Sequence, residues 1–111
     1  MPIIVTNKYH DITIKGCIVV NVMRPNTLKN SNVLGVDGDR DTVISMFLTD
    51  LRAHYAAKDA VYTELMRLSA LVHGGHTVVL ECCCKPKPCH ADVVERAINS
   101  IIAQNRITSY I

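Results

Sequence analysis

The chain has 111 residues, of which 49% are hydrophobic, with no tryptophan and a single phenylalanine. Residues 1–111 are therefore expected to form one domain with an aliphatic core. The net charge of +2 is too small to indicate nucleic-acid or membrane binding, and no apolar run reaches the roughly 18 residues that span a bilayer. No basic stretch precedes the first apolar run, so we expect no signal peptide, a cytoplasmic protein and reduced cysteines.

Two short apolar segments near the N-terminus predict the first strands of a sheet. Residues 2–6 and residues 17–23 are rich in isoleucine and valine, the β-branched residues that favour strands. Pro25 ends the second strand, because proline cannot donate a hydrogen bond to its neighbour. The connection over residues 8–17 has two possible forms, a short crossover or a hairpin through the alternating residues 12–14.

Two helices are predicted after a polar loop at residues 26–38. Asp39 and Asp59 are suitable N-caps for them, and Gly74-Gly75 ends the second. Three short strands offer little surface against which both helices could bury their apolar faces. We therefore expect a homodimer or higher homo-oligomer, with residues 43–72 at the interface. The apolar faces comprise Val43, Ile44, Phe47, Leu48 and Leu51, and then Val61, Leu65, Leu68 and Val72.

The end of the chain predicts a third strand over residues 76–84, a proline-containing loop, and a last helix over residues 89–104. The predicted order is therefore strand, strand, helix, helix, strand, helix. Apolar strands that alternate with helices indicate an α/β fold, with a small, at least partly parallel sheet and helices packed on it, in a Rossmann-like manner.

Four of the five cysteines lie around this last loop. In one interpretation, Cys82 and Cys84 share one face of the strand and are small buried hydrophobic residues. In a second, Cys82, Cys84, Cys89 and His90 supply three sulfurs and one nitrogen to a zinc ion, although their spacing is not a common zinc pattern. In a third, a thiol or His90 contacts a small ligand. We expect no required cofactor, with zinc as the alternative.

The start of the last helix also predicts an anion site. Helix N-termini present unpaired N–H groups, and ligands of open α/β sheets bind beyond the carboxyl ends of the strands. Arg40 is a further indication, because a cation in the first turn of a helix is electrostatically unfavourable. If the strands are parallel, their ends converge here. The predicted ligand-binding residues are Asn7, Arg24, Asn30, Arg40, Lys85, Cys89 and His90.

Five blocks along the chain form a pattern: residues 5–8 (Val-Thr-Asn-Lys), 23–25 with 28–31 (Met-Arg-Pro, Leu-Lys-Asn-Ser), 39–40 (Asp-Arg), 82–84 (Cys-Cys-Cys) and 86–92 (Pro-Lys-Pro-Cys-His-Ala-Asp). This pattern resembles that of a small domain of unknown function that is frequent in phage genomes. Met23, Lys29, Ser31 and Cys83 depart from it, where the family has a glycine, a Gly and a Pro in the turn, and an aromatic residue. The resemblance implies a compact α/β domain in a phage or host cytoplasm, and no established reaction.

Three functions are compatible with these residues. The first is binding, or sequestration, of an anionic nucleotide-like molecule. The second is an enzyme acting on an N-glycosidic or phosphate bond of a nucleotide, with His90 or Glu81 as the acid/base and Cys89 as the nucleophile. The third is a zinc-stabilised interaction module. Because no clear pair of base and nucleophile lies outside the one cluster, the sequence favours binding.

Overall fold

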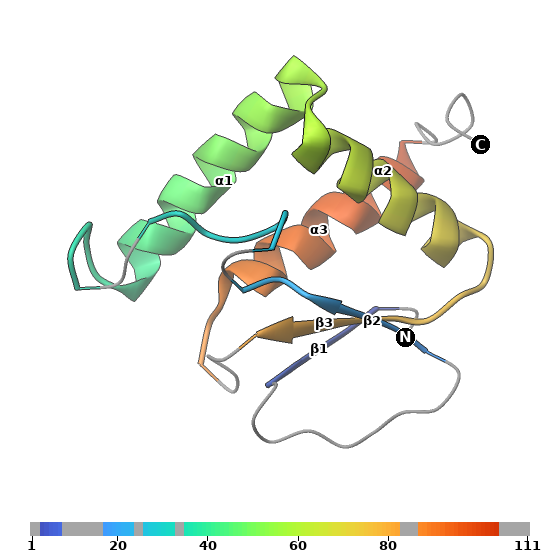
Figure 1. The fold of residues 1–111 in the computed structure, drawn as a ribbon, viewed down its shortest axis with the longest axis horizontal. Coiled ribbons are helices and arrows are strands. Elements are labelled where there is room, and N and C mark those ends of the chain that lie inside the picture. Colours follow the sequence, from blue (N-terminus) through green and yellow to red (C-terminus); the bar gives the residue numbers. More distant parts are fainter. Residues whose placement is uncertain (1–2, 8–16, 24–25, 33–34, 83–86, 105–111) are drawn as a thin grey trace.

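In the part of the chain that the structure describes, the protein forms one three-stranded sheet with three helices packed on it, as Figure 1 shows for the computed structural model. The strands are β1 (Ile3–Asn7), β2 (Ile18–Asn21) and β3 (Val78–Cys82). The helices are α1 (Arg40–Ala57), α2 (Ala60–His73) and α3 (His90–Ala103). The structure describes residues 3–7, 17–23, 26–32, 35–82 and 87–104.

The sheet has the order β1-β3-β2, and both outer strands run parallel to the central strand β3. Val5 and Val20 lie on either side of Leu80 in this register. The predicted α/β fold with a parallel sheet is thus confirmed. Since β1 and β2 are parallel and separated by β3, the chain crosses from one side of β3 to the other between them. Residues 12–14, through which the sequence also allowed a hairpin, lie outside the described residues.

The helix boundaries follow from local capping, as the sequence predicted. The Asp39 carboxylate accepts a hydrogen bond from the backbone N–H of Thr42 at 2.9 Å, which lowers the pKa of this aspartate. Asp59 caps α2 in the same way. Gly74 follows the last residue of α2, and Gly75 has a φ of 98°, in the left-handed region that only glycine adopts easily.

All three helices lie on one face of the sheet (Figure 1). Val78, Leu80 and Cys82 point to this face and are fully buried. Helix α3 is the centre of the packing, because it contacts β1, β3, α1 and α2. The apolar side chains of α1 and α2 that are buried within this single chain are Val43, Phe47, Leu51, Leu65, Met66, Leu68 and Val72.

This burial removes the reason given above for expecting a homo-oligomer. The apolar faces of α1 and α2 are covered mainly by α3 and by each other rather than by the strands. The large hydrophobic residues that remain exposed among those described are Val19, Val36 and Met46. The oligomeric state stays a prediction, because most of the apolar side chains on which it was based are buried within the single chain.

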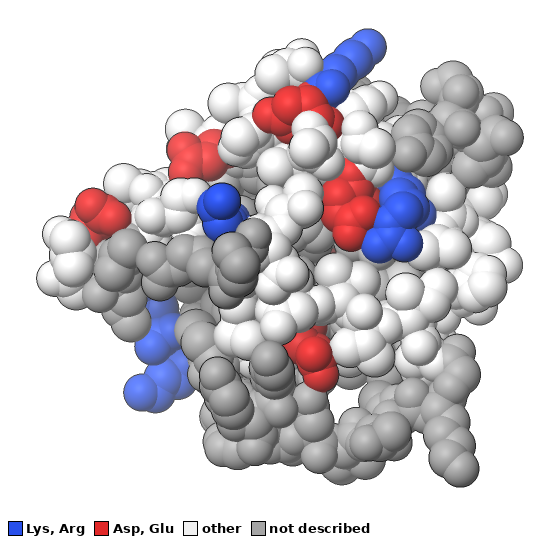
Figure 2. All heavy atoms as spheres, viewed as in Figure 1, with Lys and Arg blue, Asp and Glu red and all other residues white. Residues whose placement is uncertain are grey.

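The described surface carries charges of both signs. Figure 2 shows acidic and basic side chains interspersed over one face of the molecule, without a broad region of either sign among the side chains described there. None of the described helices is both long and apolar enough to cross a membrane.

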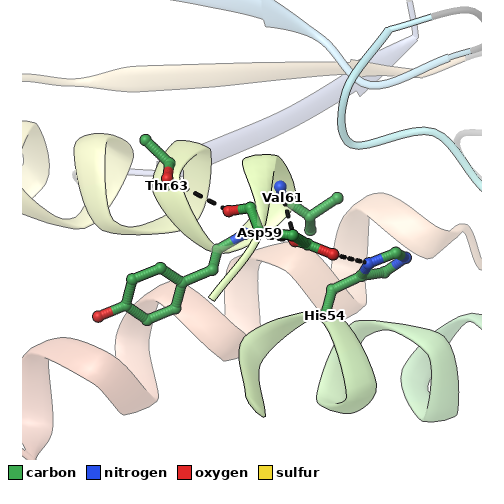
Figure 3. A network of polar contacts seen from close by, with 5 residues as sticks. His54, Asp59, Val61 and Thr63 are labelled. Atoms are coloured by element: carbon green, nitrogen blue, oxygen red, sulfur yellow. Dashed lines mark hydrogen bonds and ion pairs between the residues drawn. The ribbon is translucent and has the colours of Figure 1, made fainter. Parts of the chain in front are cut away.

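Polar contacts of Asp59 fix the turn between α1 and α2 (Figure 3). One carboxylate oxygen accepts from the backbone N–H groups of Val61 at 3.0 Å and Tyr62 at 3.3 Å, and the other is hydrogen-bonded to the His54 imidazole. The rings of Tyr55 and Tyr62 pack edge to face at 5.1 Å beside this turn. The hydrogen bond with His54 is the largest cause of the lowered pKa of Asp59, and desolvation opposes it.

We predict that Asp59 contributes an acid-sensitive part of the stability. A carboxylate whose pKa is lowered by folding stabilises the fold fully above its ordinary pKa of 3.8, and this contribution is lost as the pH falls through the lowered value. Asp59→Asn keeps an N-cap oxygen but removes the charge, whereas Asp59→Ala removes both. In thermal unfolding at pH 7, the melting temperature should therefore be highest for the wild type, lower for Asp59→Asn and lowest for Asp59→Ala.

The pH dependence separates the two contributions of Asp59. On acidification from pH 6 to pH 2.5, the stability difference between the wild type and Asp59→Asn should shrink, because protonation of the Asp59 carboxylate removes the charge that Asn lacks at every pH. A difference that stays constant over this range would show that the ion pair with His54 adds nothing to the cap.

Candidate functional site

The carboxyl ends of all three strands meet at one edge of the sheet, because the strands are parallel. β1 ends at Asn7, β2 at Asn21 and β3 at Cys82, and α3 begins at His90 with Cys89 as its N-cap. In open α/β sheets this edge is where ligands bind. We refer to the region around the start of α3, comprising Arg40, Pro88, Cys89 and His90, as the α3 start.

The His90 side chain is held from several directions. Its Nε2 lies 2.7 Å from the carbonyl oxygen of Val22, directly after β2. A carbonyl can only accept, so Nε2 carries a hydrogen and donates it. Nδ1 lies 3.7 Å from the Cys89 sulfur, and the ring packs edge to face on Phe47 of α1 with centroids 5.0 Å apart. The imidazole therefore ties α3 to β2 and α1.

Cys89 is buried, with 2% of its surface exposed, and its extended backbone precedes the first turn of α3. Its backbone N–H donates to the carboxylate of Asp92 at 3.1 Å. Asp92 is the third residue of the helix, so this bond from the N-cap backbone to its side chain is one of the contacts of a capping box. One N–H group that was expected to attract an external anion is thus occupied by a carboxylate of the protein.

Arg40 is brought to the α3 start from a distant part of the sequence. It is the first residue of α1, and its Nη1 donates to the carbonyl oxygen of Pro88 at 3.1 Å. The guanidinium therefore lies beside the residue that precedes the N-cap of α3. The guanidinium adds positive charge beside the N-terminus of α3, which favours a negatively charged group there. Asp39 and Asp41 at the start of α1 and Asp92 in α3 already supply negative charge to the two helix ends.

Glu81, which the sequence offered as an alternative acid/base to His90, lies away from the α3 start. Glu81 follows Leu80 and precedes Cys82 on β3, so its side chain is on the face of the sheet opposite to the helices. It is half-buried between the register positions of Thr6 and Asn21. Glu81 and His90 therefore lie on opposite sides of the sheet, and the structure does not bring Glu81 together with Cys89.

Asn30 has a structural role in the described loop. Its side-chain N–H donates to the Val43 carbonyl at 3.0 Å, and its oxygen accepts from the backbone and side-chain N–H groups of Asn32, each at 3.0 Å. These bonds hold the loop against α1. The ligand-binding role predicted for Asn30 stays a prediction.

Several predicted site residues cannot be placed. Arg24, Lys85 and Cys84 lie outside the described residues, as does the side chain of Asn7, whose backbone ends β1. Their predicted roles stay predictions. Met23, the residue before Arg24, is described, and its N–H donates to the side-chain oxygen of Asn21 at 2.8 Å at the same edge of the sheet.

The structure supports the interpretation of Cys82 as a buried hydrophobic residue. Cys82 is fully buried in the core, and Cys89 is nearly so. Both ring nitrogens of His90 already have partners within the protein. In the part of the chain that the structure describes, no three His, Cys, Asp or Glu side chains are grouped so that they could hold a metal ion.

Three participants in this site were not predicted. The contact of Asp92 could have been predicted from the sequence, since an acidic residue three positions after an N-cap is the pattern of a capping box. Phe47 was predicted only as part of an apolar face, and its contact with His90 depends on how α1 packs. The Val22 carbonyl had no signal, because a backbone oxygen 68 residues from His90 leaves no trace in the side-chain pattern.

Comparison with known proteins identifies one family. The model of a family described as Domain of unknown function (DUF4326) matches residues 5–100. The chain belongs to this family. The match covers β2, α1, α2 and β3 and most of β1 and α3, so the DUF4326 domain includes the α3 start. Searches of the curated proteins and of the solved structures each found no match.

We predict that this DUF4326 protein requires no metal, since Cys82 belongs to the apolar core and the His90 nitrogens are engaged. Freshly purified protein should show the mass of the metal-free chain in native mass spectrometry, and a chelator should leave its melting temperature unchanged. One zinc ion per chain, lost together with the fold on chelation, would instead establish the zinc-stabilised module.

Proposed function

We propose that this DUF4326 protein binds a small anionic, nucleotide-like ligand at the α3 start. The observation that carries this proposal is the hydrogen bond from Arg40 at the first turn of α1 to Pro88, directly before the N-cap of α3. A cation at a helix N-terminus is unfavourable by itself, and here it faces a second helix N-terminus. A phosphate or carboxylate group placed between Arg40 and the start of α3 would offset the unfavourable interaction of this cation with each helix N-terminus.

The chemistry of Arg40 suits such a ligand. Its guanidinium has five N–H donors in a planar fork, and one hydrogen bond, to Pro88, is formed with a described residue. The remaining donors match the paired oxygens of a phosphate or carboxylate. Arg40 is half-buried rather than fully exposed, so its charge is screened less by solvent than that of a surface arginine.

Asp92 sets a limit on the proposed site. Its carboxylate accepts from the N–H of Cys89 and brings negative charge to the first turn of α3. The helix terminus is therefore already partly neutralised, and an anionic ligand would depend more on Arg40 than on the terminal N–H groups. Arg24 and Lys85, which the sequence assigns to the same edge, would add to the positive charge of this site.

Sequestration is the simplest function for such a binding site, because it requires no further residues. A phage protein that holds a nucleotide-like signal in the host cytoplasm acts by mass action alone and needs no catalytic group. Assembly into a homo-oligomer would multiply the sites per particle.

A second candidate function, catalysis, is favoured by the pairing of Cys89 with His90. The sulfur lies 3.7 Å from Nδ1, while Nε2 is oriented by the Val22 carbonyl, which is the arrangement of nucleophile, base and orienting group. Such a pair would act on an N-glycosidic or phosphate bond of the bound nucleotide. The burial of Cys89 supports binding over catalysis, because a nucleophile must reach its substrate.

The binding proposal predicts a selective effect of Arg40→Gln. Nucleoside mono-, di- and triphosphates and cyclic nucleotides should be screened by thermal shift, and a bound one measured by calorimetry. Arg40→Gln should weaken its affinity by about tenfold or more, since charge-assisted hydrogen bonds contribute on the order of 1.5–3 kcal/mol. The melting temperature of the free protein should change little, because Arg40 makes one hydrogen bond to a described residue.

Lys29→Gln is the matched control, because it removes the same charge from an exposed position on the loop that precedes α1. Lys29→Gln should bind the nucleotide with the same affinity as the wild type. If both variants bound it equally weakly, the loss of affinity would come from the long-range effect of net charge and not from a contact of Arg40. If no nucleotide stabilised the wild type, the proposed function would be refuted.

Cys89→Ser distinguishes binding from catalysis. For a binding protein, the nucleotide that shifts the melting temperature should be recovered intact after prolonged incubation with the wild type, as measured by liquid chromatography and mass spectrometry. Release of a base or of phosphate by the wild type, but not by Cys89→Ser, would establish the enzymatic alternative.

A further inference from the structure

A separate groove lies between α1 and α3, with Leu65 of α2 contributing to it. Its volume is about 530 Å³, within the range of cavities that bind ligands or partner side chains. Leu48 and Ala97 are half-buried along it, above more deeply buried neighbours. We call it the α1–α3 groove; its apolar lining is Leu48, Leu51, Leu65, Val93, Ala97 and Ile101.

Two arginines give this groove a distinct charge. Arg52 comes from α1 and Arg96 from α3, so each helical wall carries one exposed guanidinium. Neither is hydrogen-bonded or ion-paired with another residue that the structure describes. Among the described residues that line the groove there is no aspartate or glutamate, and the two arginines give this lining a formal charge of +2.

This charge distribution discriminates between possible occupants. If a second copy packed groove against groove, a two-fold axis would bring two Arg52 and two Arg96 side chains together, and burying like charges is costly. Residues 105–111 contain Arg106 and no acidic residue, so they do not complement the walls either. A fatty acid carries its charge at one end, whereas these cations lie on both walls.

An acidic amphipathic helix has the complementary pattern. Its apolar stripe runs along the middle of one face and its carboxylates flank that stripe on both sides. We propose that the α1–α3 groove docks such a helix from a partner protein. The apolar stripe packs on Leu48 and Ala97, and the flanking carboxylates pair with Arg52 and Arg96. This site shares no residue with the α3 start, so the proposal stands independently of the proposed function.

The test uses the full chain and a synthetic peptide of about 18 residues, the length of a five-turn helix. The peptide has leucines at helical spacing with glutamates on either side of them, and a matched peptide has lysines instead. In fluorescence anisotropy, the acidic peptide should bind saturably and the basic peptide should not. The double variant Arg52→Gln/Arg96→Gln should weaken binding by at least about tenfold, and added salt should weaken wild-type binding.

Charge reversal provides the sharpest outcome. Arg52→Glu/Arg96→Glu should no longer bind the acidic peptide and should bind the basic peptide instead. Lys29→Gln should bind both peptides as the wild type does. Both arginines are exposed, and circular dichroism checks that each variant is folded.

Three results would overturn the proposal. The first is a failure of the acidic peptide to bind, or binding that charge reversal leaves unchanged. The second is displacement of the bound acidic peptide by laurate at submillimolar concentration, which would assign the groove to a lipid-like anion. The third is a dimer in light scattering that becomes tighter in Arg52→Gln/Arg96→Gln, which would assign it to a second copy of the chain.

Discussion

The parallel pairing of β3 with both of its neighbours is the constraint on which the other parts of the structure depend. β3 is the central strand, and its residues Val78, Leu80 and Cys82 are fully buried beneath the helices. Because both outer strands run in the same direction, all three carboxyl ends reach one edge of the sheet. This places the start of α3 beside the end of β2, and it gives the candidate site its position.

His90 connects this edge to the helical layer. Through one imidazole ring it contacts the carbonyl that follows β2, the N-cap of its own helix, and Phe47 of α1. Such a residue has a structural role whether or not it meets a ligand. Arg40 differs from it, because its hydrogen bond to Pro88 leaves guanidinium donors for another partner, while its charge is poorly placed for the stability of α1.

Different parts of helix α3 contribute to the α3 start and to the α1–α3 groove. Its first turn belongs to the carboxyl edge of the sheet, and its middle, from Val93 to Ile101, forms one wall of the α1–α3 groove. The same helix buries Val94 and Ile98 in the core. Because α3 packs on β1, β3, α1 and α2, one well-packed helix presents both surfaces, and exposed charges such as Arg96 lie outside the core.

The order and approximate ends of the six described elements could be predicted from the sequence, since strand composition, N-cap aspartates such as Asp39 and Asp59, and the Gly74-Gly75 stop are local features. The sequence also predicted that the strand ends and the start of α3 would meet. The strand order, the parallel direction of β1 and β2, and the covering of α1 and α2 by α3 depend on tertiary packing and could not be predicted in this way. The contacts of the site also depend on tertiary packing, because Arg40 and Pro88 are 48 residues apart and His90 and Val22 are 68 apart. Residue periodicity carries information about the face that a side chain occupies, and none about which distant backbone carbonyl it meets.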